Sequence, residues 1–240
     1  MKRVFANSLA NSDRLEKEFA KRGRWVTKFT IDGKSYGGEM SFENDTRIQQ
    51  FFDNFPEVHS ILDLGSLEGG QTFQLAKHPD VHILGIEGRK YNIRRAKFAQ
   101  RVLGIKNVDF LLADLETTNL TSFGQFDAVF CSGILYHLSE PWKLVKQIKA
   151  VTNRLFIWTH YAGEDKADQM INGFRGWWYQ EYGFKDPQSG LSPKSFWLTL
   201  QSLQAMLKQH GFTNQKIIED NPGHPHGPCV TIAAWTEDTK

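Results

Sequence analysis

Three acidic residues stand at the ends of successive apolar runs, and a glycine-containing turn follows the first of them. They are Asp63, Glu87 and Asp114, and Gly65 and Gly69 come shortly after Asp63. Glycine lets main-chain N–H groups approach a ligand closely at such a turn. A carboxylate at the spacing of Glu87 from Gly65 can accept both hydroxyl hydrogen bonds of a ribose. Any one acid could simply cap a loop or helix, but the three together predict a nucleotide-type site.

The elements that would position these acids alternate between strands and helices. Apolar runs predict five strands and a further C-terminal pair, at residues 60–64, 81–88, 108–114, 126–133, 154–159, 216–219 and 230–235. Helical patterns lie between them, at residues 90–102, 141–150 and 198–210. This order predicts an α/β fold with a doubly wound, mostly parallel seven-stranded sheet and an antiparallel C-terminal strand pair. Ligands of such sheets bind outside the carboxyl ends of the strands, where the three acids lie.

Residues 1–57 are expected to form an N-terminal arm, and residues 58–240 the ligand-binding domain. The arm reads as helix, hairpin and helix, with a turn at Asp32-Gly33 and the second helix from about Asp45 to Phe55. The first helix extends to about residue 23, and its apolar face comprises Phe5, Leu9, Leu15 and Phe19. Such an arm can be structural packing or a substrate cap, and the sequence leaves both open.

The span from about residue 161 to residue 197 interrupts this alternation and is rich in aromatic residues. It predicts a long irregular insertion, which in a compact domain is usually a lid or a binding loop. Its place after the fifth strand puts it at the carboxyl edge of the sheet. The rings expected to bind substrate are those of Tyr161, Trp177, Trp178 and Tyr179, which can stack on a flat or cationic acceptor. A small accessory core is an equally good interpretation.

Composition narrows the class of protein. The chain has 240 residues, 40% of them apolar, and a formal net charge of +2, which favours one large soluble domain over a dedicated nucleic-acid binder. Its two cysteines, Cys131 and Cys229, match no zinc or redox spacing. The N-terminus lacks the apolar segment of a signal peptide, and no run is long enough to span a membrane. We therefore expect a cytoplasmic protein with no membrane partner.

A second motif follows the fourth predicted strand. Residues 126–141 contain Gly133-Ile134-Leu135-Tyr136-His137-Leu138 and end at Pro141. This segment resembles the fourth motif of the class I S-adenosylmethionine-dependent methyltransferases, in a form found in small-molecule methyltransferases and in enzymes that modify the wobble uridine of tRNA. Residues 63–69 resemble the first motif of that family, an Asp/Glu-x-Gly-x-Gly-x-Gly loop, although Leu67 replaces its middle glycine. The resemblance covers residues 58–160 and, in outline, the C-terminal hairpin.

The resemblance implies S-adenosylmethionine as cofactor and S-adenosylhomocysteine as product. In the family, the acid matching Glu87 holds the ribose, the acid matching Asp114 faces the adenine, and the loop after Asp63 holds the methionine end. The strand end that matches Ser132 and Gly133 passes beneath the sulfonium. The residues expected to bind the cofactor are therefore Asp63, Gly65, Ser66, Leu67, Gly69, Glu87, Gly88, Asp114, Leu115, Ser132 and Gly133.

A nicotinamide-dependent dehydrogenase is the main alternative for a glycine turn followed by an acid. Its fingerprint requires glycine at positions 65, 67 and 70, and Leu67 breaks that pattern. A methyltransferase loop tolerates the change better, because no pyrophosphate demands so close an approach to the main chain. The Tyr136-His137 motif also has no role in a dehydrogenase.

Methyl transfer from a sulfonium is an SN2 displacement, in which positioning and exclusion of water supply most of the acceleration. A general base is needed only where the acceptor carries a proton, and histidine as a residue type suits that role. We expect His137 to be that base, or else a hydrogen-bonding residue, with Tyr136 and His160 beside it. His224 and His226 are expected at the rim, and no metal site is predicted.

The acceptor expected from the enclosed aromatic segment and the near-neutral charge is a small molecule, methylated on oxygen or nitrogen. A tRNA-modifying enzyme is the first alternative, so a nucleic-acid partner is disfavoured and remains open. A protein that binds S-adenosylmethionine without catalysis is the second alternative.

Overall fold

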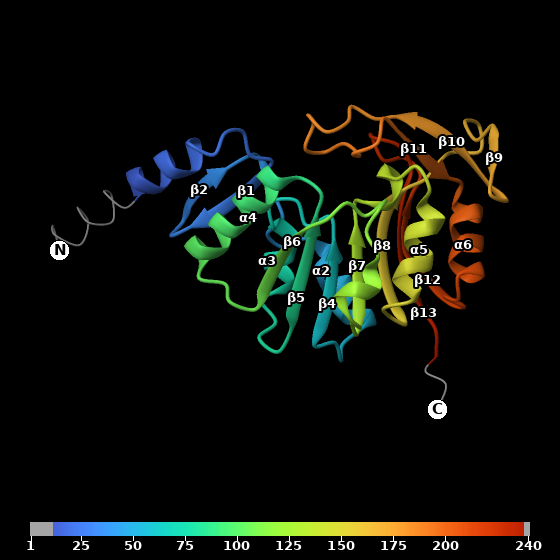
Figure 1. Cartoon of the computed structure of the whole chain (residues 1–240), viewed down its shortest axis with the longest axis horizontal. Coiled ribbons are helices and arrows are strands. Elements are labelled where there is room, and N and C mark those ends of the chain that lie inside the picture. The colour runs from blue at the N-terminus through green and yellow to red at the C-terminus, as the bar shows by residue number, and fades with distance from the viewer. Residues whose placement is uncertain (1–11, 238–240) are drawn as a thin grey trace.

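A computed structural model of the chain describes residues 12–237. Its central sheet has seven strands in the order β12-β13-β8-β7-β4-β5-β6 (Figure 1). They are β4 (Ser60–Leu64), β5 (His82–Glu87), β6 (Val108–Leu112), β7 (Ala128–Ser132), β8 (Arg154–His160), β12 (Asn214–Asn221) and β13 (Cys229–Trp235). Neighbouring strands from β8 to β6 are parallel, and β13 is antiparallel to both β8 and β12. The predicted fold class is confirmed.

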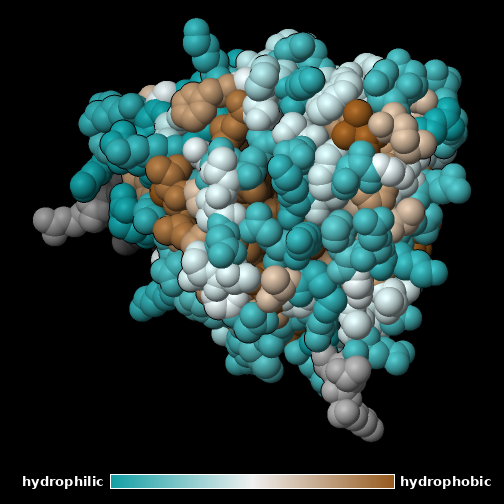
Figure 2. Space-filling view, turned by 45° about the vertical axis from the view of Figure 1, so that its right-hand side comes forward, coloured by the Kyte–Doolittle hydropathy of each residue, from teal (hydrophilic) through white to brown (hydrophobic). Residues whose placement is uncertain are grey.

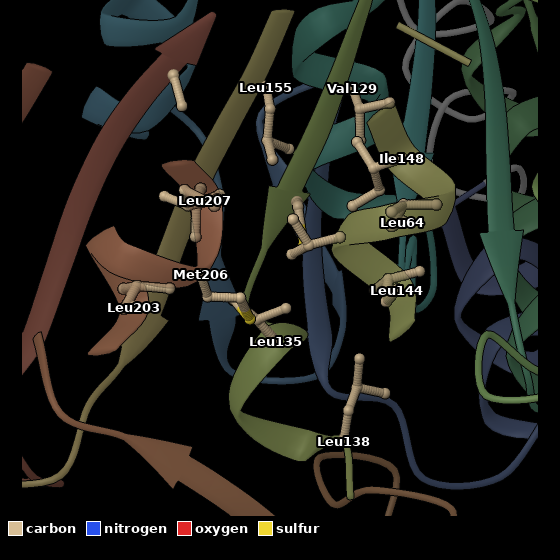
Figure 3. Packing of buried hydrophobic residues seen from close by; sticks show 14 of the residues in the cluster. Leu64, Val129, Leu135, Leu138, Leu144, Ile148, Leu155, Leu203, Met206 and Leu207 are labelled. Carbon is tan, nitrogen blue, oxygen red and sulfur yellow. The ribbon is translucent and has the colours of Figure 1, made fainter. Parts of the chain in front are cut away.

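Helices cover both faces of this sheet. They are α2 (Thr46–Asn54), α3 (Gly70–Leu75), α4 (Lys90–Leu103), α5 (Pro141–Lys149) and α6 (Leu200–Gln209), with the 3-10 helices η1 (Leu120–Phe123) and η2 (Leu135–His137). Successive residues of a strand point to opposite faces, so Ile61 packs with α2, α3 and α4 whereas Leu62 packs with α5 and α6. Figure 3 shows the second of these clusters, where Val129 and Leu155 of the sheet face side chains of α5 and α6.

Two small three-stranded sheets accompany the central one. The N-terminal sheet comprises β1 (Thr27–Ile31), β2 (Lys34–Gly37) and β3 (Met40–Ser41), and the insertion sheet comprises β9 (Gln169–Ile171), β10 (Phe174–Gln180) and β11 (Lys194–Leu198). Figure 1 shows the first in blue at the upper left and the second in orange at the upper right.

The insertion sheet corrects the expectation of an irregular segment. Its aromatic residues pair across antiparallel strands, with Trp177 opposite Trp197 and Trp178 opposite Phe196. Aromatic pairs of this kind stabilise a sheet through packing between neighbouring strands. The segment therefore contains a regular sheet, while residues 161–168 and 181–193 lie outside its strands.

The N-terminal arm packs onto the core through apolar side chains. Residues 12–20 are helical, and the hairpin predicted at Asp32-Gly33 joins β1 to β2. Phe19 and Trp25 belong to the same hydrophobic cluster as Phe98 of α4. Phe5 and Leu9, predicted to lie on the first helical face, fall outside the described residues.

A buried carboxylate also joins the arm to the glycine loop. Glu68 is fully buried, and its Oε2 accepts hydrogen bonds from the main-chain N–H groups of Val26 and Thr27 at 2.9 and 2.7 Å. Its Oε1 accepts a hydrogen bond from Arg95 of α4 at 3.0 Å. Because a buried charge needs partners of this kind, the arm completes the environment of the loop. The division of the chain at residue 57 remains a prediction.

The surface in the view of Figure 2 is mainly hydrophilic, and its apolar side chains form small separate groups. Large exposed apolar side chains include Met170 and Tyr182, both of which belong to the insertion. Within residues 12–237, no helix is both long enough and apolar enough to cross a membrane.

Candidate active site

A cavity of about 880 Å³ opens where the parallel strands end. Its walls come from the ends of β4, β5 and β7, from residues 40–47 of the arm and from the segment 179–191 of the insertion. Both small sheets therefore border the space that the three strand-end acids share. Its volume is within the range of roughly 300–1,000 Å³ that is usual for small-molecule sites.

The loop between β4 and α3 contains three residues in the left-handed conformation. Gly65, Leu67 and Gly69 have φ angles of 76°, 51° and 87°. Glycine adopts positive φ freely, whereas for other residues the left-handed region costs about 1–2 kcal/mol. Leu67 thus adopts a conformation in which glycine would be unstrained. Its N–H donates to Oε2 of Glu87 at 3.1 Å, which links the loop to β5.

Glu87 is buried at the end of β5, where main-chain donors orient its carboxylate. Oε1 accepts a hydrogen bond from the N–H of Arg89 at 2.7 Å, and Oε2 accepts the one from Leu67. Burial raises the pKa of Glu87, and these hydrogen bonds oppose that rise. Each carboxylate oxygen can accept a further hydrogen bond, and Glu87 lines the cavity. The arrangement fits a diol that donates two hydrogen bonds.

Asp63 lies on the neighbouring strand and is also buried against the cavity. Burial raises the pKa of Asp63 to about 7; the Thr72 hydroxyl, which donates to Oδ2 at 2.6 Å, opposes this, and the charge of Glu87 adds to it. A nearby cation favours the ionised form of a carboxyl group. Asp63 is therefore suited to bind the ammonium group of a methionine moiety.

The other residues predicted to bind the cofactor lie around the same end of the cavity, with one exception. Those that line it are Gly65, Ser66, Leu67, Gly88, Asp114, Leu115, Ser132 and Gly133. Gly69 does not line it and instead caps α3. The buried Oγ of Ser66 has no hydrogen-bond partner within residues 12–237, so a ligand could supply one. With the buried carboxylates, this orphan hydroxyl fits the polar groups of S-adenosylmethionine.

Tyr136, His137 and His160 come together in the wall of the same cavity. The Tyr136 ring lies 4.1 Å from the His137 ring and 4.8 Å from the His160 ring, measured between centroids. Burial raises the pKa of the Tyr136 hydroxyl above its usual range. Tyr136 is therefore neutral at physiological pH and can donate a hydrogen bond.

His160 is held in one tautomer by the last loop of the chain. Its Nδ1 lies 2.9 Å from the carbonyl oxygen of Gly227 and 3.1 Å from that of Pro228. Carbonyl oxygens only accept hydrogen bonds, so Nδ1 carries the proton. Burial lowers the pKa of His160, and its ring stacks on Trp197 at 5.3 Å. His160 is therefore a neutral imidazole.

Comparison with known proteins identifies this arrangement. A family described as a methyltransferase domain matches residues 57–175. The N-terminal domain of EvdMO1, crystallised in the presence of S-adenosylhomocysteine and D-fucose, is 32% identical to this chain, with a TM-score of 0.86 over 94% of this chain and 97% of that domain. The chain belongs to the class I S-adenosylmethionine-dependent methyltransferases. Its cofactor is S-adenosylmethionine and its product S-adenosylhomocysteine.

Three further relatives of the methyltransferase are longer than the matched region. The tRNA U34 carboxymethyltransferase of Campylobacter concisus is 28% identical over 109 residues, which are 44% of this chain and 37% of that protein. Protein RP789 of Rickettsia prowazekii is 35% identical over 85 residues, or 15% of its length. The match to EvdMO1 as a whole covers 47% of that protein, at 30% identity and a TM-score of 0.74. The chain therefore spans less than half the length of these three proteins.

Among the aromatic residues of β10, the structure brings Tyr179 to the cavity of the methyltransferase. Trp177 does not line the cavity and packs beside Tyr179, with 5.7 Å between ring centroids. Trp178 points to the opposite face of the strand, where its ring lies 5.0 Å from Phe196. Because side chains alternate along a strand, three successive aromatic residues cannot all face one ligand.

Tyr161 and the two rim histidines also have defined places in the methyltransferase. The hydroxyl of Tyr161 donates to Asp220 at 2.9 Å, and Tyr161 does not line the cavity. His224 and His226 do line it, beyond His160. In the part of the chain that the structure describes, no group of three or more His, Cys, Asp or Glu side chains could hold a metal ion.

Sequence reasoning missed Arg47, which the start of α2 places at the cavity of the methyltransferase. Its guanidinium donates to both carboxylate oxygens of Asp45, at 2.8 and 2.6 Å, and to Ser132 Oγ at 3.2 Å. Gln71 of α3 donates to the same two residues. Arg47 and Ser132 are 85 positions apart, so no local pattern could have joined them.

Arg89, also missed, fastens the insertion to the cofactor end of the cavity. It is buried two residues after Glu87, the last residue of β5. Its Nη2 donates to the carbonyl oxygens of Ser189 at 2.7 Å and Gly183 at 3.2 Å. A single side chain thereby holds the loop between β10 and β11 against the site of the methyltransferase.

Two substitutions in the glycine loop are expected to have opposite outcomes. Gly65→Ala should weaken binding of S-adenosylhomocysteine at least about tenfold, because its Cβ would lie 1.9 Å from Ile134 Cδ1 and alanine is strained at this φ. Leu67→Gly should preserve binding within about threefold, since glycine adopts the same conformation without strain. Isothermal calorimetry measures both, and equal losses for the two variants would contradict the left-handed loop.

Proposed function

We propose that this methyltransferase transfers its methyl group to a hydroxyl oxygen of a small, polyhydroxylated acceptor such as a sugar. The observation that carries the proposal is the mixed wall at the far end of the cavity. Trp158, Tyr179 and Trp197 offer aromatic surfaces there, and Asn221 and His224 offer polar atoms. Aromatic faces suit the C–H surfaces of a sugar ring, and a few convergent polar groups suit its hydroxyls.

The relatives support two different acceptor classes. The N-terminal domain of EvdMO1 was crystallised in the presence of D-fucose and matches nearly the whole of this chain. The tRNA U34 carboxymethyltransferases of Campylobacter concisus and Campylobacter curvus are 28% and 24% identical and match smaller parts of it. The wider match favours the small-molecule acceptor, and tRNA is the alternative that an assay must test.

In this proposal the strand-end residues bind the cofactor and the second motif binds the acceptor. Glu87 accepts hydrogen bonds from the ribose, Asp114 borders the adenine, and Asp63 binds the methionine ammonium group. When bound, S-adenosylmethionine supplies an electrophilic methyl group. His137 receives the hydroxyl proton, while Tyr136 orients the acceptor by a hydrogen bond.

In this proposal the arm and the insertion each cover part of the cavity. The N-terminal arm is assigned to residues 1–57 and covers the cavity with its residues 40–47, the methyltransferase domain is assigned to residues 58–240, and the insertion at about 161–197 covers the acceptor end. The places of Arg47 of the arm and Tyr179 of the insertion in the cavity wall support a role for both segments in ligand binding. The composition of the chain supports a cytoplasmic location.

A transfer assay tests the acceptor class. Purified protein is incubated with methyl-labelled S-adenosylmethionine and either a panel of sugars that includes D-fucose or total tRNA. We expect label on a sugar hydroxyl, with an equal amount of S-adenosylhomocysteine released. Label in tRNA and in no sugar would replace the proposal with the tRNA alternative. Protein with Glu87→Ala controls for contaminating enzymes.

A further inference from the structure

A second buried carboxylate, Glu181, lies at the acceptor end of the cavity, directly after β10. Its side chain is 1% exposed, and its Oε1 lies 3.0 Å from Nδ1 of His137. Ser195 Oγ donates to the same oxygen at 2.7 Å, and Ser189 Oγ and the Gly190 N–H donate to Oε2 at 2.5 and 2.8 Å. Four donors thus surround one carboxylate, which is the environment of an ionised group rather than a neutral one.

The charge of Glu181 follows from these contacts. Burial alone would raise the pKa of Glu181, but the hydrogen bond and the positive charge of a protonated His137, together with the hydrogen bonds from Ser189 and Gly190, outweigh it and hold the pKa at about 2. Glu181 is therefore a carboxylate throughout the physiological range. An ionised carboxylate accepts hydrogen bonds and donates none.

This contact fixes the tautomer of His137. Because Glu181 only accepts, Nδ1 of His137 must carry a proton, and in the neutral ring Nε2 then carries the lone pair. Within residues 12–237 no side chain or main-chain group hydrogen-bonds to Nε2, and His137 lines the cavity. Nε2 is thus the nitrogen available to a ligand.

We propose that Glu181 is a positioning residue that holds His137 with its basic Nε2 directed at the acceptor hydroxyl. The inference rests on the proposed function, since only a protonated acceptor requires a base. The hydroxyl proton passes to Nε2 as the acceptor oxygen bonds to the methyl carbon. The carbon–sulfur bond breaks with its electron pair left on sulfur, so the sulfonium charge is lost and the imidazolium charge appears beside Glu181.

Three other groups near His137 are either neutral or already paired, so Glu181 is the charged partner of His137. Tyr136 of η2 is neutral because burial raises the pKa of its hydroxyl. His160 of β8 is neutral because burial lowers its pKa. Arg47 of α2 is positive but is paired with Asp45. An imidazolium formed at His137 is therefore stabilised by Glu181.

The loop that carries Glu181 is also fastened to the cofactor site. Arg89 donates to the carbonyl oxygens of Ser189 and Gly190, the residues that hydrogen-bond to Oε2 of Glu181. Arg89 in turn follows Glu87 in the chain and donates its N–H to it. One continuous chain of hydrogen bonds thus runs from the proposed ribose acid to the proposed base.

The test compares Glu181→Gln with a matched control in the same insertion, Glu164→Gln. Glu164 is exposed and pairs with Arg175, outside the cavity wall. The first readout needs no acceptor. It is ¹⁵N NMR of histidine-labelled protein with S-adenosylhomocysteine bound, and the signal of His137 is identified by its loss in His137→Gln. We expect the Nδ1–H tautomer in the wild type and in Glu164→Gln. In Glu181→Gln the amide can donate to Nδ1, so the Nε2–H tautomer should appear.

The second readout is steady-state kinetics with the acceptor found in the transfer assay. Glu181→Gln should lower kcat about 100-fold, the scale of a lost general base, while KM for the acceptor changes less than about threefold. Glu181→Asp should recover part of kcat, because it restores the charge. Ser195→Ala, which removes one donor to Glu181 without altering His137, should lower kcat by a smaller factor.

These outcomes separate the two proposals. Absence of methylation of any hydroxyl by the wild type would contradict the proposed function but leave the NMR test in force. An Nε2–H tautomer in the wild type would overturn the role of Glu181. The role of Glu181 would also be overturned if Glu181→Gln had the same His137 tautomer as Glu164→Gln, or the same kcat.

Discussion

Replacing Glu87 by alanine is expected to abolish binding of S-adenosylhomocysteine. In the proposed assignment the variant loses two charge-assisted hydrogen bonds to the ribose, each worth about 1.5–3 kcal/mol. It also leaves the N–H groups of Leu67 and Arg89 without their acceptor, so the loop beside the ligand loses its support. We expect affinity to fall at least about 100-fold by isothermal calorimetry, with 1.4 kcal/mol for each factor of ten.

Two further variants make the Glu87 experiment specific. Glu57→Ala removes an exposed carboxylate just before β4 and should leave affinity unchanged. Glu87→Gln keeps the size of the side chain but has only one acceptor oxygen, whereas the N–H groups of Leu67 and Arg89 donate to two. This variant should therefore bind S-adenosylhomocysteine with intermediate affinity. If Glu87→Ala bound as tightly as Glu57→Ala, the ribose would have to lie elsewhere.

That Asp63, Glu87 and Asp114 line one cavity was predictable, because the local sequence places each of them near the end of a strand. Asp63, Glu87 and Asp114 each end or follow a strand of the parallel sheet, and parallel strands bring their carboxyl ends to one edge. Leu67 made the glycine loop an imperfect match, and its φ of 51° places it in the left-handed region that glycine adopts without strain. In that conformation the N–H of Leu67 donates a hydrogen bond to Glu87.

The acceptor end was only partly predictable, because its contacts join distant parts of the chain. His137 could be found in a motif, but Glu181 is 44 residues away from it and stands in a segment that offered no motif. Residues 177–179 are all aromatic, so they do not show the alternation of apolar and polar residues by which a strand is predicted. Once β10 forms, alternation sends Tyr179 to the cavity and Trp178 to the other face.

Asp63→Asn is expected to stabilise the protein without ligand at alkaline pH. The folded pKa of Asp63 is raised to about 7, from an ordinary value of 3.8. The folded state therefore binds this proton more tightly than the unfolded state does, so the contribution of Asp63 is most favourable below about pH 4 and is lost as the pH rises to about 7. At about 1.4 kcal/mol per tenfold change in proton affinity, the loss is on the order of 4 kcal/mol.

Asparagine cannot ionise, and its amide oxygen can still accept the hydrogen bond from Thr72. Asp63→Asn should therefore have a higher Tm than the wild type at pH 8 and the same Tm near pH 4, measured by scanning calorimetry without ligand. Asp127→Asn, near the opposite end of the neighbouring strand, is the control, and its effect on stability at pH 8 should have the opposite sign. The N–H groups of His59 and Ser60 help to lower the pKa of Asp127 against the effect of its burial, so this variant should lose stability at pH 8.

The same substitution should weaken ligand binding, which separates the role of Asp63 from a purely structural one. Binding of a cationic methionine moiety favours ionised Asp63, so the wild type should release a proton when S-adenosylhomocysteine binds at pH 6. Calorimetry in buffers of different ionisation enthalpy measures that proton, and Asp63→Asn should release none through this group. If the wild type and Asp63→Asn had equal Tm values at pH 8, Asp63 would not carry a destabilising charge. Proton release that survives in Asp63→Asn would assign the ammonium site to another residue.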